Sequence, residues 1–199
     1  MRISLVPLIS LVSLLCACAS QAPAVPPPAA ATQAAAPAPA AAAPAVELEE
    51  APYTAVQIRD ASPTGRRIVF KVEEPGKPVV KRTTEFVKSD ADGADLRTTV
   101  VDDKGGVVDT STSRATWEEL RAHGRFPKGR VEVKHRTISV PLGTLMCTVY
   151  KVTEGEGEAA ESTTYYFADD LPGPPVFFFT EKGGKRIRSS TMEASSTGK

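Results

Sequence analysis

The sequence predicts a mainly β (α+β) fold, namely a curved antiparallel sheet of up to nine strands with one or two short helices. Three observations lead to this fold. Residues 47–199 contain nine short runs of strand-forming residues, and Gly- and Asp-rich turns join many of them. Strand follows strand mostly without an intervening helix, which excludes a doubly wound parallel sheet. All Gly and all aromatic residues lie in this part of the chain, which is long enough for a core.

The expected strands follow one another closely along residues 47–199. They cover residues 67–72, 79–87, 94–102, 107–113, 131–140, 145–153, 162–168, 176–180 and 185–192. Because most of the joints are short, sequential strands are expected to be antiparallel neighbours.

Two short helices are expected from their N-terminal capping boxes. Thr54 is followed three residues later by Gln57, which predicts a helix over residues 55–61. Thr116 is followed by Glu119 in the same spacing, which predicts a second helix after Thr116. Both helices would pack on one face of the sheet.

Residues 1–17 have the composition of a secretory signal peptide. Arg2 precedes an apolar run from Ile3 to Leu15, and small residues follow it. The run is shorter than the ~20 apolar residues of a membrane-spanning helix. We therefore expect residues 1–17 to direct export and to be removed.

The end of this signal, Leu15-Cys16-Ala17-Cys18, resembles a bacterial lipobox, in which a lipid is added to a Cys thiol and cleavage occurs before that Cys. Leu15 lies three residues before Cys18 and the small Ala17 immediately before it, so Cys18 is the expected lipidation site. The alternative is ordinary cleavage nearby, which leaves Cys18 as a free thiol. The resemblance implies thioether-linked diacylglycerol and an amide-linked chain such as palmitate, which together anchor the chain stably. Ala19, in place of Asp, implies the outer membrane if the source is Gram-negative.

Residues 18–46 are expected to be the lipidated Cys18 followed by a disordered Ala/Pro-rich linker. Of the 28 residues from Ala19 to Val46, 15 are Ala and 7 are Pro, and none is charged. Pro interrupts every helical stretch, and nothing in the segment can form a core. The extended segment would reach about 85 Å from the membrane. A Pro-rich recognition ligand is the alternative, but no basic residue flanks a PxxP motif, which favours a spacer.

Composition excludes several classes of function. The formal net charge of +0 argues against a broadly basic nucleic-acid binder, and three Cys and two His exclude a disulfide scaffold and a Cys/His zinc domain. Gly-x-Ser-x-Gly, His-Glu-x-x-His and Walker-type motifs are absent. We therefore predict no catalytic residue, no metal site and no cofactor. Cys147, between Leu145 and Val149, is expected to be a small buried hydrophobe rather than a nucleophile.

Aromatic residues are concentrated in one region, with seven of the twelve between Tyr150 and Phe179. Strand alternation makes both faces of this part of the sheet apolar. Two interpretations remain open: a sheet covered on both sides, or an open apolar groove for an acyl chain or another lipid-like ligand. The candidate groove residues are Tyr150, Tyr165, Phe167, Phe177 and Phe179.

Four motifs follow one another in residues 140–176. They are Val140-Pro-Leu-Gly-Thr144, Cys147-Thr-Val-Tyr150, Tyr165-Tyr-Phe-Ala168 and Leu171-Pro-Gly-Pro-Pro175-Val. Their order resembles that of an uncharacterised family of bacterial envelope proteins. Such domains resemble, more distantly, the half-barrels of periplasmic lipoprotein carriers, which hold acyl chains in a curved sheet closed by helices. The family resemblance implies no activity and no catalytic residues.

These patterns together predict a non-enzymatic envelope lipoprotein, anchored in the outer membrane, that binds a lipid-like ligand or an envelope protein. One alternative is a hydrolase-like envelope enzyme whose site forms only in the fold. Another is a purely structural lipoprotein without a pocket. A pocket would separate the first from the third, whereas polar side chains converging in a cleft would favour the enzyme. The sequence predicts no oligomeric state.

Overall fold

Alternating burial along β1 (Arg67–Glu73) shows which face of the sheet forms the core. The computed structural model describes residues 46–197. In β1, the side chains of Ile68, Phe70 and Val72 are buried, whereas Arg67 is exposed. Since successive side chains of a strand point to opposite faces, these three residues mark the core face of the sheet.

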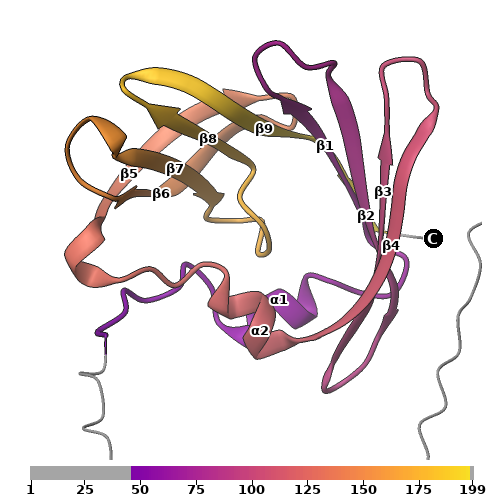
Figure 1. The fold of residues 1–199 in the computed structure, drawn as a ribbon. Coiled ribbons are helices and arrows are strands. Elements are labelled where there is room, and N and C mark those ends of the chain that lie inside the picture. The colour runs from indigo at the N-terminus through magenta and orange to yellow at the C-terminus, as the bar shows by residue number, and fades with distance from the viewer. Residues whose placement is uncertain (1–45, 198–199) are drawn as a thin grey trace, which may run out of the picture. The chain divides into compact units, whose positions relative to one another are not determined.

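All nine predicted strands are present and form one open antiparallel sheet, so the predicted fold class is confirmed. The order across the sheet is β4-β3-β2-β1-β9-β8-β7-β6-β5. Figure 1 shows that this sheet is strongly curved. The remaining strands are β2 (Val80–Ser89), β3 (Gly93–Val101), β4 (Val107–Thr116), β5 (Val131–Val140), β6 (Gly143–Glu154), β7 (Glu161–Ala168), β8 (Phe177–Lys182) and β9 (Lys185–Ser196).

The centre of the sheet is a pairing between its first and last strands. Every other neighbouring pair is consecutive along the chain, but β1 pairs with β9, and Arg67 lies opposite Ser196. The register shifts between Val69 and Phe70, which indicates a bulge there. The sheet therefore consists of two runs of hairpins, β1 to β4 and β5 to β9, joined along one seam.

Two short helices, α1 (Ala55–Asp60) and α2 (Trp117–Ala122), lie on the concave side of the curved sheet (Figure 1). Both predicted capping boxes are present, and α1 ends one residue before the predicted end. The side chains of Ile58 and Trp117 are 5% exposed each, so each helix turns an apolar side chain inward. Short single-turn helices η1 (Lys128–Arg130) and η2 (Gly157–Ala159) lie in the connections.

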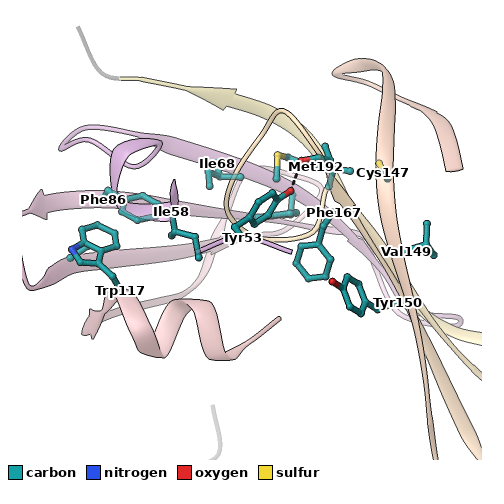
Figure 2. Packing of buried hydrophobic residues seen from close by; sticks show 14 of the residues in the cluster. Tyr53, Ile58, Ile68, Phe86, Trp117, Cys147, Val149, Tyr150, Phe167 and Met192 are labelled. Atoms are coloured by element: carbon teal, nitrogen blue, oxygen red, sulfur yellow. Dashed lines mark hydrogen bonds between the residues drawn. The ribbon is translucent and has the colours of Figure 1, made fainter. Parts of the chain in front are cut away.

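The core connects the segment before α1 to the β6–β7 part of the sheet. The Tyr53 hydroxyl donates a hydrogen bond to the carbonyl oxygen of Ala168, as the dashed line in Figure 2 shows. The Tyr53 ring meets Phe167 edge-on at 6.2 Å, and Tyr150 meets the same Phe167 edge-on at 5.7 Å. Edge-to-face contact is a favourable arrangement of aromatic rings, so the Tyr53 contact helps hold the segment before α1 against the sheet.

The predicted signal peptide, Cys18 and the Ala/Pro-rich linker up to residue 45 lie outside the described residues. None of the helices within residues 46–197 has the length and apolar character that a membrane crossing requires.

Candidate functional site

A cavity of about 380 Å³ lies between the concave face of the sheet and its cover. Both halves of the sheet contribute to its wall. The cover consists of the segment before α1, the two helices and the loop around Gly173. The volume falls within the range of small-molecule pockets in proteins.

The wall of this cavity is mainly apolar and rich in aromatic rings. Side chains of β1, β2, β3, β7 and β8 line it together with residues of the cover. The apolar lining residues of the sheet are Ile68, Phe70, Phe86, Leu96, Tyr165, Phe167 and Phe178, and those of the cover include Tyr53, Ile58 and Leu120. An apolar wall of this kind favours a ligand with a hydrocarbon part.

Tyr53 shows how little water reaches the inner part of the cover. Its side chain is 5% exposed, and burial raises the pKa of its hydroxyl well above the ordinary value. Its hydrogen bond to Ala168 satisfies the hydroxyl, so the buried tyrosine leaves no unpaired donor.

The polar side chains of the lining are few, and none is acidic. Thr84 and Arg82 come from β2, Arg121 from α2, and His123 from the end of α2. Burial lowers the pKa of Arg82, and the neighbouring Arg188 guanidinium lowers it further. The ionisable groups of the lining, apart from tyrosine, are therefore basic.

The sequence-predicted groove residues separate into two sets. Tyr165 and Phe167 line the cavity, and Tyr150 packs beside Phe167 at 4% exposure without lining it. Phe177 and Phe179 do not line the cavity.

The register of β7 with β8 explains this separation. Tyr165 lies opposite Phe178, and Tyr166 lies opposite Phe177. Residues directly opposite each other in an antiparallel pair share a face, so Phe178 lines the cavity with Tyr165. The sequence predicted Phe177 and Phe179 as groove residues, whereas the register puts Phe178 beside Tyr165 in the cavity wall.

Phe177 and Phe179 instead form a cluster with Tyr166 on the other face of the sheet. The Phe177 and Phe179 rings lie 5.7 Å apart, and Tyr166 lies 5.4 Å from Phe177. The Arg186 guanidinium lies 4.2 Å from the centre of the Phe179 ring, a cation–π contact. The rings and Arg186 therefore shield one another on this face, where Tyr166, Phe177 and Phe179 are half-buried.

Cys147 is a core residue, as the sequence predicted. Its side chain is completely buried, and burial raises the pKa of the thiol to about 11. The cross-strand neighbour of Cys147 on β5 is Arg136 rather than a histidine. His135 lies opposite Thr148 instead, 3.5 Å from its hydroxyl. A reactive cysteine needs a lowered pKa, so this thiol lacks the property of a nucleophile.

No cluster of three or more His, Cys, Asp or Glu side chains suited to a metal ion occurs in the described part of the chain. Sequence reasoning missed Arg82, Phe70 and Phe86 as cavity residues. Their alternation along β1 and β2 was readable, but the pairing that brings β2 and β7 to one cavity was not.

No protein-family model matches the chain, and no curated protein matches it. The structure is similar to the crystal structure of a protein from Bacteroides fragilis NCTC 9343, described by inference as an exported protein with a YmcC-like fold. The TM-score is 0.43 at 10% identity, and the match covers 68% of this chain and 97% of the other. What this chain does therefore has to be inferred from its own residues and cavity.

Proposed function

We propose that the chain is an outer-membrane lipoprotein whose domain binds the acyl chain of a lipid-like ligand in the concave cavity. The observation that carries this proposal is the aromatic-lined cavity of about 380 Å³ beneath α1 and α2. Burying apolar ligand surface there would contribute roughly 25 cal/mol per Å² before the costs of binding. The lipobox-like sequence around Cys18 supports a lipid anchor in the envelope.

Thr84 and Thr83 offer a matched pair of variants for testing this function. They are adjacent on β2, both are half-buried, and only Thr84 lines the cavity. Thr84→Trp would fill part of the cavity, whereas Thr83→Trp places the same ring on the opposite face.

The experiment is native mass spectrometry of the segment Glu47–Lys199 exported to a bacterial periplasm. We expect a co-purifying species with the mass of a lipid in the unsubstituted segment and in Thr83→Trp. Its occupancy should fall at least severalfold in Thr84→Trp. An unsubstituted segment that carries no lipid, and takes up none when incubated with phospholipid vesicles, would contradict the proposal and favour a structural role.

A further inference from the structure

Arg82 is a cavity residue whose charge has no partner within residues 46–197. Its guanidinium lies 5.1 Å from the centre of the Phe70 ring, against the apolar wall. None of the ion pairs or side-chain hydrogen bonds found in the described residues involves it. Its Nε–H is buried and has no acceptor. A buried donor without an acceptor is costly, and a bound ligand that accepts from it would remove this cost.

The guanidinium groups of two other arginines near the cavity have partners in the described residues. Arg66 is 2% exposed, but it donates hydrogen bonds to Ser62 Oγ at 2.9 Å and to the Pro172 carbonyl at 3.0 Å. Arg121 lines the cavity, and its Nε–H is also buried without an acceptor, but its guanidinium forms an ion pair with Glu118 at 3.2 Å. Arg82 therefore differs from both in lacking any counter-charge or acceptor.

Two further groups on the cavity face of the sheet suit an anion, although neither lines the cavity itself. Ser190 is 1% exposed, and its hydroxyl has no hydrogen-bond partner. It lies opposite Val72 and opposite the cavity residue Phe178, so it belongs to the same face of the sheet. Arg188, two residues earlier on β9, holds its guanidinium 5.7 Å from the Phe178 ring. The carboxylate beside Arg188 is Glu74, at 3.8 Å.

Arg82 also lies away from the helix-covered end of its strand. At the opposite end of β2, Ser89 donates to the carbonyl of Ser62, which directly follows the α1 segment. Phe86, at that end, pairs through its backbone N–H with Arg66. An apolar tail under the helices would thus leave its polar end near Arg82.

We infer that the cavity ligand carries an anionic head group, a carboxylate or a phosphate, and that Arg82 binds it, with Ser190 and Arg188 on the same face of the sheet. The inference rests on the proposed acyl-chain binding and adds the charge of the ligand. A guanidinium presents a planar fork of donors that matches both carboxylate and phosphate oxygens.

The test uses the full-length chain in membranes of the producing cells. Three photoreactive probes share one diazirine-bearing tail of about sixteen carbons, a length on the order of common acyl chains. The probes are the fatty acid, the lysophosphatidic acid and the neutral alcohol. Label is mapped by mass spectrometry to peptides that contain cavity residues. The variant is Arg82→Gln, and the matched control is Arg67→Gln, which removes the same charge from an exposed residue on the other face of β1.

We expect one or both acidic probes to label cavity peptides of the unsubstituted chain more strongly than the alcohol does. Arg82→Gln should lower acidic labelling about tenfold and leave alcohol labelling unchanged, which also shows that the variant is folded. Arg67→Gln should behave as the unsubstituted chain, and Arg82→Lys should retain part of the acidic labelling. The acidic probe that loses more label in Arg82→Gln carries the preferred head group, either carboxylate or phosphate.

Two results would overturn the inference and are distinguishable. If acids and alcohol label the cavity equally and Arg82→Gln changes neither, the ligand is not selected by charge, and acyl-chain binding stands. If no probe labels cavity peptides, acyl-chain binding itself fails, and the head-group site fails with it.

Discussion

Cys147 shows what complete burial does to one side chain. With 0% exposure and a pKa raised to about 11, the thiol should react slowly with a thiol reagent in the folded protein and rapidly after denaturation. Cys147→Ala leaves a small cavity and should lower the free energy of unfolding by about 1 kcal/mol. Cys147→Arg buries an unpaired charge and should be far more destabilising. Reagent kinetics and urea denaturation measure both effects, and rapid labelling of the native protein would refute the assignment.

Arg66 connects the residues after α1 to the loop between β7 and β8. Its guanidinium donates to Ser62 and to the Pro172 carbonyl, so Arg66→Met leaves buried polar groups unpaired. We expect this variant to lose about 2–3 kcal/mol of unfolding free energy. Urea denaturation measures the loss, and the exposed neighbour in Arg67→Met should change by less than about 0.5 kcal/mol. Equal losses in the two variants would mean that these hydrogen bonds contribute little.

At the residue scale, sequence reasoning succeeded where alternation within one strand decides the outcome. Tyr165 and Phe167 share a face because they are two residues apart, and both line the cavity. Phe178 could not be chosen over Phe177 and Phe179 in this way. The loop between β7 and β8 sets their register, and a shift of one residue exchanges the two faces.

The N-terminal cap of α2 predicts a dependence of stability on pH. The Glu119 carboxylate accepts from the Thr116 backbone N–H at 2.7 Å, and this bond, with that from the Thr116 hydroxyl, holds the pKa of Glu119 below its ordinary value of 4.5. A lowered folded-state pKa means that the ionised form stabilises the fold. This stabilisation is present above pH 4.5 and is lost as the pH falls through the folded-state pKa.

The variant Glu119→Gln measures this contribution, because Gln accepts the same bonds without a charge. We expect the unsubstituted protein to be the more stable of the two at pH 7 and the difference to shrink as the medium is acidified below pH 4.5. Thermal unfolding at a series of pH values follows it. A difference independent of pH would show that the charge of Glu119 plays no part in the cap.

At the element scale, the sequence predicted almost everything, because the deciding signals are local. Both helices begin where a Thr is followed three residues later by Gln or Glu, and both capping boxes form. The strands were located by turn residues such as Gly105, whose φ of 82° suits glycine. Several strands extend past their predicted ends, by four residues in β9, because pairing with a neighbour extends a strand past its local signal.

At the scale of the whole molecule, the predicted lipid anchor can be tested by exchanging single cysteines. Cys18→Ser should abolish acylation and block processing at that site, because Cys18 carries the lipobox spacing. Cys16→Ser is the matched control and should leave both intact. Metabolic labelling with a palmitate analogue reports the outcome, and label retained in Cys18→Ser would contradict the assignment.

The pairing of β1 with β9 could not be predicted from the sequence, although the consecutive pairs were. Turn residues identify hairpins, which are local, but nothing local states that β1 pairs with β9. The cavity depends on this seam, because residues of β1 to β3 and of β7 and β8 reach it from opposite sides. For the same reason the sequence could not predict which residues line the cavity together, although its apolar members, such as Phe70 and Phe86, lie on strands that the sequence predicted.

The seam between β1 and β9 also sets a condition on the order of folding. The β1 to β4 run can form soon after its synthesis, but β1 keeps an open hydrogen-bonding edge until the last strand, residues Lys185–Ser196, is present. Pairing that spans from Arg67 to Ser196 has a high loop-closure cost, so it forms late. An unpaired inner edge invites pairing with other chains. A chain that ends before β9 would therefore hold two half-sheets with open inner edges, prone to aggregation and proteolysis.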